Sequence, residues 1–322
     1  MNLLVLDRLD PAQQSALATL IARSEAADQH PALSEDLRDP AGRIDLIHHG
    51  ARAVLAVQGE SAEPGEPGEP GEPGEPGQGE LAGCATLTPG ADGLTSLHLA
   101  IDPAHRGGDL RTTLIAKALA HTSAPVRLWI ILASRDDDEA VAPLGFQPER
   151  DLLQMGVPLP LAADIVAATR PVETRSFVVG QDDEMWLSVN NRAFAGHPEQ
   201  GNWTLEKLRS REQLEWFDPH GFLLAPDPNA EGRGLIGSCW TKVHRHHTPI
   251  LGEIYVISVD PARHGEGWGR ALTVAGLQWL SGQGLSVGML YTDASNTTAV
   301  ALYRSLGFTV DHIDRSYLRS AG

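Results

Sequence analysis

The feature that most constrains the fold is a segment that occurs twice. The stretch IDPAHRGGDLRTTLI, residues 101–115, aligns with VDPARHGEGWGRALT, residues 259–273, at a constant spacing of 158 residues. A second repeated element, LGF, occurs at residues 144–146 and again at residues 306–308. Repetition of this kind indicates a structural unit copied in tandem. A chain of 322 residues is long enough for two such units, each with its own core.

Hydrophobic patterns around both copies predict the same alternation of strands and helices. For the N-terminal copy the pattern predicts helices over 11–29 and 112–122, with strands that end near 101 and span 126–133. For the C-terminal copy it predicts helices over 182–196, 269–284 and 297–308, with strands over 221–227, 234–244, 252–260 and 286–292. Alternation of this kind is typical of an α/β fold, and we expect a mixed sheet in each copy.

Two stretches interrupt the predicted strands and helices. The tract EPGEPGEPGEPGEPG, residues 63–77, places glycine at every third position, but five triplets are too few for a collagen helix. Because it lacks apolar residues, we expect a disordered loop over 61–80. The proline-bearing segment 158–173 is typical of a connection between units. We therefore expect an N-terminal domain of residues 1–155, a linker of 156–172 and a C-terminal domain of 173–322.

Composition excludes several classes of protein. The formal net charge of −17 argues against binding to nucleic acid or an anionic membrane, because like charges repel. Cys84 and Cys239 have neither a disulfide nor a metal-ligand spacing. The N-terminus lacks the basic region of a signal peptide, and no apolar run approaches the ~18 residues of a membrane span. We expect a cytoplasmic monomer that acts on a small molecule, with no metal, nucleic-acid or membrane partner.

The C-terminal copy of the repeated segment keeps glycines at 265, 267 and 269 between a predicted strand and a predicted helix. Glycine lets the backbone approach a ligand closely, and the positive end of the helix dipole favours an anion such as a diphosphate. The spacing matches neither a P-loop nor a dinucleotide fingerprint. On the glycines alone, a structural tight turn remains an alternative.

Residues around this loop carry a more specific pattern. His264 to Gly269, followed by the N-x-x-A-x-x-x-Y-x-x-x-G-F arrangement at 296–308, resembles the signature of the GNAT acetyltransferase superfamily. The tandem copies, with NNRAFAGHPEQGNWT at 190–204, WTKVH at 240–244 and GEIYVISVDP at 252–261, resemble the mycothiol synthase family within it. The resemblance implies two tandem GNAT acyl-CoA N-acyltransferase domains. It also implies acetyl transfer from acetyl-CoA to the cysteinyl amine of desacetylmycothiol.

The resemblance also implies which residues bind the two substrates. The positions that match acetyl-CoA contacts are Ile257, Ser258, Val259, His264, Gly265, Glu266, Gly267, Trp268, Gly269, Arg270, Asn296, Thr297, Thr298, Ala299, Val300 and Ala301. The positions that match contacts to desacetylmycothiol are Glu35, Glu199, Lys242, Glu253 and Tyr291. Carboxylates and a lysine suit a ligand that carries one amine and many hydroxyls, and pantetheine amides can pair with a strand edge.

Two residues are candidates for catalysis. An amine attacks a thioester only when neutral, and an α-amine titrates at roughly 7 to 8, so a mild base is sufficient. Glu253, on the strand that enters the glycine loop, is placed to accept that proton. Tyr303 is placed to protonate the leaving thiolate or to donate a hydrogen bond to it. Cys84 belongs to the N-terminal copy and Cys239 has no paired histidine, so direct attack by the amine is the economical mechanism.

The N-terminal copy lacks these groups. At the matching offsets it has Thr95, Ser134 and Val141 in place of the glutamate, the asparagine and the tyrosine. Asp109 and Arg111 replace two loop glycines, and Asp109 would place an acid where a diphosphate lies. We therefore expect the N-terminal copy to be a non-catalytic scaffold that completes the substrate cleft.

Other polar and aromatic positions have simpler interpretations. His264 stands where glutamine or arginine is usual in the superfamily, so we expect a pH-sensitive affinity for CoA. His244, His246 and His247 are interpreted as a surface turn rather than a metal site. The tryptophans expected in the core or cleft wall are Trp186, Trp203, Trp216, Trp240 and Trp279. Two alternatives to the leading function are a GNAT enzyme for another small amine and a non-catalytic acyl-CoA sensor.

Overall fold

The computed structural model describes most of the chain and divides it into two compact units. The first unit is Met1–Asp151 with Ile313–Gly322, and the second is Leu152–His312. The repeat tract at 63–77, Gly107, Glu35, Glu199 and His246 lie outside the described residues. The described residues are 1–28, 32–33, 37, 43–47, 49–58, 80–90, 93–106, 108–196, 200–229, 234–245 and 247–321.

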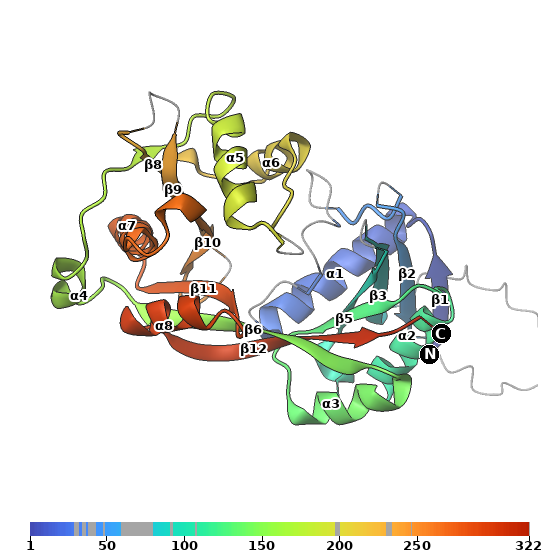
Figure 1. Cartoon of the computed structure of the whole chain (residues 1–322). Helices are drawn as coiled ribbons and strands as arrows, with labels where there is room; N and C mark the ends of the chain where they lie inside the picture. Colours follow the sequence, from blue (N-terminus) through green and yellow to red (C-terminus); the bar gives the residue numbers. More distant parts are fainter. Residues whose placement is uncertain are drawn as a thin grey trace, which may run out of the picture. The chain divides into compact units, whose positions relative to one another are not determined.

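The first unit is a sheet of order β1-β2-β3-β4-β5-β12, with helices on both faces (Figure 1). Strand β12 (Thr309–Arg319) is the last strand of the chain. Neighbouring strands are antiparallel except for the parallel pair β4 and β5. Its elements are β1 (Asn2–Leu6), α1 (Pro11–Asp28), β2 (Arg52–Val57), β3 (Leu81–Pro89), β4 (Thr95–Ile101), the 3-10 turn η2 (Pro103–His105), α2 (Leu110–Leu119), β5 (Val126–Ile130), α3 (Arg135–Val141) and the 3-10 turn η3 (Ala142–Leu144).

Strand β2 shows why this sheet is covered on both faces. Its residues alternate between two hydrophobic clusters, as the two-residue period of a strand requires. Ala53 and Leu55 pack in the cluster that holds the buried residues of α1. Val54 and Ala56 pack in the cluster that holds those of α2. A strand that is buried on both faces has a continuous run of apolar residues. In β2 this run is AVLAV, which follows Arg52.

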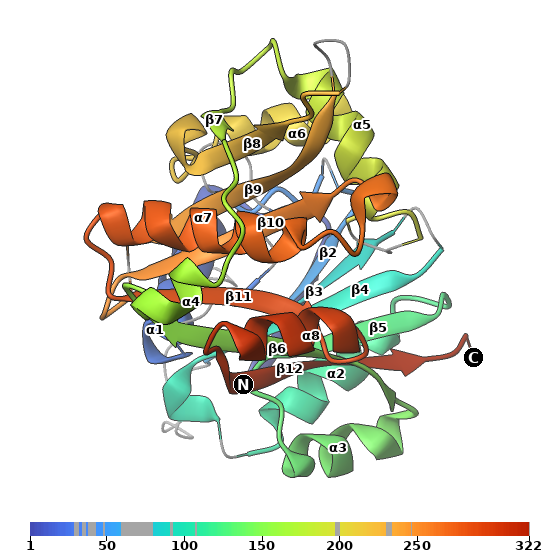
Figure 2. The same cartoon turned by 60° about the vertical axis from the view of Figure 1, so that its left-hand side comes forward.

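The second unit is a sheet of order β6-β11-β10-β9-β8-β7, and β10 and β11 are its parallel pair (Figure 2). Figure 2 shows α7 and α8 in front of this sheet and α5 with α6 near β8 and β9. Its elements are β6 (Gln147–Pro158), α4 (Ala163–Ala167), β7 (Arg175–Ser176), α5 (Asp183–Ala193), α6 (Leu205–Glu212), the 3-10 turn η4 (Pro219–Gly221), β8 (Phe222–Pro226), β9 (Leu235–His244), β10 (Leu251–Val259), the 3-10 turn η5 (Pro261–Arg263), α7 (Trp268–Gly282), β11 (Val287–Asp293) and α8 (Thr297–Ser305).

An aromatic cluster fills one face of the second sheet. Trp240 of β9 stacks on Phe222 with ring centroids 4.3 Å apart and meets Trp186 of α5 edge to face at 5.7 Å. Trp186 and Trp203 lie in the same buried cluster, so the core interpretation of these tryptophans is confirmed. Such ring pairs add stabilisation beyond the apolar area they bury.

The opposite face of that sheet is packed against α7 at very short range. A Cβ atom added at Gly276 would lie 2.4 Å from Cys239 Sγ and 2.8 Å from Ile254 Cδ1. Only glycine lets the helix backbone come this close to β9 and β10. Helix α7 is therefore fixed against the two strands that carry most of the candidate site.

The strand that ends each sequence copy pairs in the sheet of the other unit. Residues Leu152–Pro158 of β6 pair antiparallel with β11, so the end of the N-terminal copy completes the second sheet. Residues Arg315–Arg319 of β12 pair antiparallel with β5, so the end of the chain completes the first sheet. Neither strand was recognised in the sequence, which had suggested only a connection after residue 158.

Buried polar contacts hold β12 in the first unit. The Tyr317 ring is fully buried, and its hydroxyl donates to Asp138 Oδ1 at 2.7 Å. Arg315 donates to Asp138 at 2.9 Å and to Asp151 at 2.6 Å. The hydrogen bonds from Tyr317 and Arg315 lower the pKa of Asp138 below its usual value. The acidic first turn of α3 is therefore an anchor for the last strand.

Candidate active site

A β-bulge in β10 sets the geometry of the site. The register between β9 and β10 shifts between Ile254 and Val256, so Tyr255 is an extra residue in that strand. Such a bulge reverses the alternation of side chains beyond it. Tyr255 and Val256 consequently both pack toward the aromatic cluster, where the Tyr255 ring lies 5.3 Å from Trp240.

The same bulge marks the point where β10 leaves β11. Strand β10 pairs with β9 along its length, but its parallel pairing with β11 covers only Leu251 to Ile254. Both strands continue past that point, β10 to Val259 and β11 to Asp293. Figure 2 shows β10 turning away from β11 as it approaches α7. Because β10 is not paired with β11 beyond Ile254, the backbone of Ile257 to Val259 has one strand edge facing the gap between the two strands. An extended chain of amides can pair with such an edge as an added strand.

Glu253 lies on β10 just before the bulge and is almost completely buried, with 6% of its surface exposed. One carboxylate oxygen, Oε2, lies 2.7 Å from Nε2 of His244, the last residue of β9. His244 was interpreted from the sequence as part of a surface turn, and that interpretation is wrong. Its ring is buried because it packs back across the strand pair onto Glu253.

Among the other residues predicted to contact the acceptor substrate, Lys242 lies beside Glu253. Lys242 is the register partner of Glu253 across the β9–β10 ladder, so the two side chains share one face of the sheet. Its ammonium lies over the rings of Trp216 and Tyr255, at 4.7 Å and 5.4 Å from their centroids. Tyr291 lies on β11, half-buried, in the part of that strand past its pairing with β10. Glu35 and Glu199 lie outside the described residues.

The glycine loop between η5 and α7 adopts the conformation that its glycines permit. Gly265 and Gly267 both have positive φ, at 80° and 83°, and Gly267 is the N-cap of α7. Two left-handed residues in this order turn backbone N–H groups toward one side of the loop. The His264 ring turns back to the Val259 carbonyl at 3.2 Å. The loop and the first turn of a 15-residue helix together fit a diphosphate.

Arg170, which sequence reasoning missed, packs on this loop. Its guanidinium lies 3.4 Å from the centroid of the Trp268 ring and donates to the Glu266 carbonyl at 2.6 Å. The Trp268 indole N–H in turn donates to the Glu266 carboxylate at 2.9 Å. Arg170 adds a cation beside a site suited to phosphate. No local signal marked it, because it lies 96 residues before Glu266 in the sequence.

Helix α8 supplies the remaining predicted positions. Asn296 caps it by accepting from the Ala299 N–H at 3.1 Å, and Thr297, Thr298 and Ala301 are exposed. The rest of its first turns are less exposed, with Ala299 half-buried and Val300 buried. Arg270 of α7 donates to Ser305 Oγ at 2.9 Å, which ties the two helices together.

Tyr303 is buried on α8, with 7% of its surface exposed. Burial raises the pKa of its hydroxyl to about 12, and the nearby Cys239 thiol contributes to the rise. Because Cys239 is also the residue against which Gly276 of α7 packs, Tyr303 lies on the α7 face of the sheet. Glu253 lies on the other face, so the two candidate catalytic groups approach the diverging strands from opposite sides.

Comparison with known proteins identifies this arrangement. The model of the acetyltransferase (GNAT) family matches residues 186–308. A mycothiol acetyltransferase of Kocuria rhizophila is 39% identical over 316 residues, covering 94% of this chain and 94% of the relative. One of Salinispora arenicola is 39% identical and covers 98% of this chain and 95% of its own. The chain belongs to the mycothiol acetyltransferase family.

Solved structures extend the likeness over the whole chain. A GCN5-related N-acetyltransferase of Sphaerobacter thermophilus has a TM-score of 0.64 and 26% identity, covering 98% of this chain and 95% of its own. A tandem GNAT protein from the clavulanic acid biosynthesis pathway has a TM-score of 0.67 and 13% identity, covering 100% and 98%. The predicted tandem GNAT fold is confirmed, and membership of the family makes the protein an acetyl-CoA-dependent N-acetyltransferase.

The bulge also corrects the comparison between the two copies. In both, an aspartate caps the 3-10 turn that follows the strand. Strand β4 pairs with β3 in one unbroken register, whereas β10 has its extra residue. Counted back from the turn, Glu253 therefore corresponds to Ser96 and not to Thr95, because the sequence offset fails by one residue before the bulge. Ser96 is not a carboxylate either, so the N-terminal strand still carries no base at this position.

The N-terminal loop also differs in backbone conformation from the loop that the mycothiol acetyltransferase pattern requires. Asp109, the N-cap of α2, has a φ of −76°, where its counterpart Gly267 has 83°. Val141, the counterpart of Tyr303, is fully buried in the core of the first unit. The prediction that this copy is not catalytic remains a prediction, and these two differences support it.

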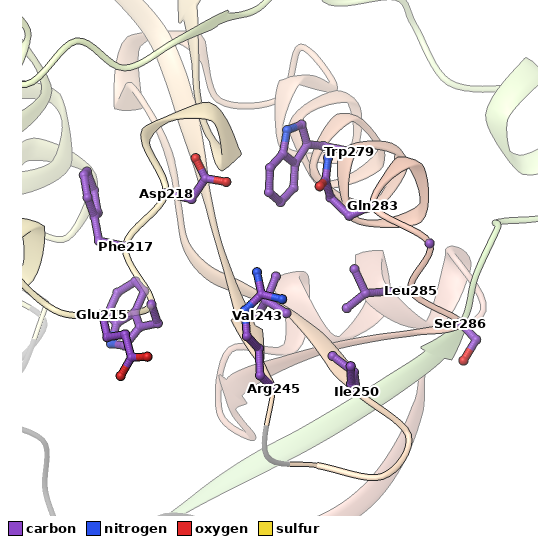
Figure 3. Close-up of a pocket in the computed structure, with 12 residues that line it drawn as sticks. Glu215, Phe217, Asp218, Val243, Arg245, Ile250, Trp279, Gln283, Leu285 and Ser286 are labelled. Carbon is purple, nitrogen blue, oxygen red and sulfur yellow. The ribbon is translucent and has the colours of Figure 1, made fainter.

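A cavity of about 540 Å³ lies in the second unit at the other end of α7 from the glycine loop (Figure 3). Figure 3 shows the Arg245 side chain pointing into it, with Trp279 and Leu285 on its walls and Asp218 across from them. None of its lining residues is a predicted contact of either substrate, so the candidate site of this family member does not include it.

Among the described residues, every helix is too short or too polar to span a lipid bilayer. Within the same part of the chain, no group of three or more histidine, cysteine, aspartate or glutamate side chains is placed to hold a metal ion.

Replacing Arg170 with alanine is expected to raise the dissociation constant of CoA about 3- to 10-fold, because an exposed cation beside phosphate contributes roughly 1 kcal/mol. The dissociation constant is measured by calorimetry, for CoA and for inorganic pyrophosphate. Arg135→Ala, at an exposed arginine of the first unit, is the matched control. An unchanged affinity for both ligands would mean that Arg170 only covers the Trp268 ring.

Proposed function

We propose that the protein transfers the acetyl group of acetyl-CoA to the cysteinyl amine of desacetylmycothiol, the last step of mycothiol biosynthesis. The observation that carries the proposal is the buried Glu253, held between Lys242 and His244 on the strand that leads into the glycine loop. A base at this place serves an amine acceptor. The names of relatives that match nearly the whole chain support this acceptor over other amines.

The residues of the second unit divide the binding of acetyl-CoA among them. The left-handed loop at Gly265 and Gly267 and the start of α7 would hold the diphosphate. The edge of β10 from Ile257 to Val259 would pair with the pantetheine amides, since β10 leaves β11 before this stretch. Most of these proposed contacts to acetyl-CoA come from backbone groups. Histidine at position 264, in place of the usual glutamine or arginine, is therefore compatible with binding.

Glu253 is the proposed base. It accepts a proton from the amine, the nitrogen forms a bond to the acetyl carbon, and the carbon–sulfur bond breaks with its electron pair on sulfur. Tyr303 then donates a hydrogen bond to the thiolate. Since the pKa of Tyr303 is about 12 and that of a thiol is near 8.5, the proton remains on the tyrosine rather than transferring.

Burial also disfavours a covalent route through a cysteine. Both thiols, Cys84 and Cys239, are buried, and burial raises the pKa of each to about 12. A thiol that remains protonated at neutral pH is a poor nucleophile. The two reduced thiols also support the proposal that the protein works in the cytoplasm. The monomeric state stays a prediction.

The decisive experiment measures release of free CoA thiol from acetyl-CoA with desacetylmycothiol, cysteine and glucosamine offered separately. We expect rapid turnover with desacetylmycothiol and at least 100-fold lower kcat/KM with either fragment, because each fragment forfeits the contacts of the other half. Equal turnover with all three would favour a GNAT enzyme for another small amine. Binding of acetyl-CoA without turnover of any acceptor would favour the sensor.

A further inference from the structure

We propose that His244 is a positioning residue that holds the Glu253 carboxylate for catalysis and makes its strength as a base depend on pH. The inference rests on the proposed function, in which Glu253 is the base. It adds a residue from a neighbouring strand to the catalytic machinery and gives it a role distinct from substrate contact.

The geometry of the strand pair brings the two side chains together. His244 is opposite Leu251 in the register, so Glu253 is its diagonal neighbour two residues further along β10. Diagonal neighbours on one face of an antiparallel pair are within reach of long side chains. His244 Nε2 lies 2.7 Å from Glu253 Oε2, and only 12% and 8% of the two side chains are exposed. A contact this short between buried polar groups fixes the carboxylate in one orientation.

That orientation matters because a general base must present its carboxylate to the substrate amine in a fixed geometry. The contact between Oε2 and the imidazole supplies this constraint. When neutral, His244 donates one N–H from Nε2 and leaves Glu253 able to accept a proton. When His244 is protonated, its charge stabilises the anionic carboxylate and makes Glu253 a weaker base. Imidazole is the side chain whose charge ordinarily changes between pH 5 and 8.

In the described part of the chain, Lys242 and His247 are charged or titratable groups placed beside this pair. Lys242 lies on the same face of β9 and is directed to the Trp216 and Tyr255 rings. His247, on the turn after β9, places its ring edge to face against His244 with centroids 5.3 Å apart. Lys242 favours the anionic form of Glu253 at every working pH. A pH-dependent change in the strength of the base therefore comes from the histidines.

Two variants of His244 separate positioning from simple packing. His244→Gln keeps an N–H donor that reaches as far as Nε2 but does not titrate, and His244→Leu fills similar space without a donor. We expect kcat to fall about 30-fold in His244→Leu and to stay within about 3-fold of the wild type in His244→Gln at pH 8.5. The dissociation constant of acetyl-CoA is expected to be unchanged in both, and His220→Leu, at an exposed histidine, serves as the matched control.

The pH profile of kcat tests the second half of the proposal. In His244→Gln the acidic limb is expected to lose the contribution of the histidine and to move toward lower pH. Equal losses of kcat in the glutamine and leucine variants, or a glutamine profile that superimposes on the wild type, would overturn the proposal.

A measurement without turnover keeps this inference separate from the proposed function. The imidazole nitrogen resonances of His244 are followed by NMR against pH in the substrate-free protein and in Glu253→Gln. We expect the titration of His244 to shift when the carboxylate becomes an amide, whichever acceptor the enzyme uses. An identical titration in the two proteins would overturn the inference even if desacetylmycothiol is the substrate.

Discussion

Replacing Glu253 with glutamine is expected to lower kcat about 100- to 1,000-fold, which is the range that a positioned general base contributes. The amide keeps the size of the side chain and its contact with His244 but cannot accept the proton of the amine. The wild-type side chain, on a strand paired on both sides, is almost fully buried, so little bulk water reaches it to replace the lost base. Steady-state rates of CoA release with desacetylmycothiol, measured from pH 6 to 9, give the effect.

The loss should be confined to chemistry. We expect the dissociation constant of acetyl-CoA to stay within about 2-fold of the wild type, because the glycine loop and α8 are untouched. Raising the pH should recover part of the rate, since more of the amine is then already neutral. Glu184→Gln, at an exposed glutamate of α5, is the matched control. A Glu253→Gln enzyme with more than a third of the wild-type kcat would exclude Glu253 as the base.

Replacing Tyr317 with alanine is expected to destabilise the first unit by about 3 to 5 kcal/mol, the cost of removing a large buried ring. The ring is fully buried in the core cluster that also holds Phe146 and Leu128. The substitution also removes the hydroxyl that donates to Asp138. Urea unfolding followed by circular dichroism gives the free energy of unfolding, and hydrogen exchange of the β5 amides shows where the loss occurs.

Tyr317→Phe separates the ring from its hydroxyl. We expect it to cost about 1 to 2 kcal/mol, because the ring remains and only one hydrogen bond is lost. Deleting Ile313–Gly322 should be more severe than either substitution, since it removes the strand that pairs with β5. Amides of β10 in the second unit should exchange at the wild-type rate in Tyr317→Phe. Equal protection of β5 in the wild type and in Tyr317→Ala would show that β12 does not support the first unit.

The sequence predicts the elements whose periodicity is local and misses those defined by a distant partner. Helices α7 and α8 have strong apolar periodicity, and Asn296 and Gly307 lie at the two ends of α8. Strand β6 begins with the polar run QPERD, which has no alternation to recognise. Strand β12 carries Asp314, which accepts from the Leu132 N–H, and Arg315, which donates to Asp138 of α3 and Asp151 of β6. These partners are far away in the sequence, so no local pattern marks the strand.

The candidate site divides in the same way. The loop glycines are recognisable because their positive φ is a local requirement, and Glu253 follows from the strand that enters the loop. His244 and Arg170 could not be assigned, because the first depends on the β9–β10 register and the second on a contact across 96 residues. No sequence pattern marks the bulge at Tyr255 either. Because of this extra residue, the alignment of the two copies is wrong by one residue for the part of β10 before the bulge.

The place of β12 has a consequence for how the protein is made. A ribosome completes the N-terminal sequence first, yet the sheet of that unit lacks its final strand until residues 315–319 have left the exit tunnel. Throughout that interval the edge of β5 is an open template for another strand, which is the kind of surface that invites aggregation or exchange between chains. The first half of the gene therefore does not encode a complete folding unit, because expressing it alone leaves out the strand that pairs with β5.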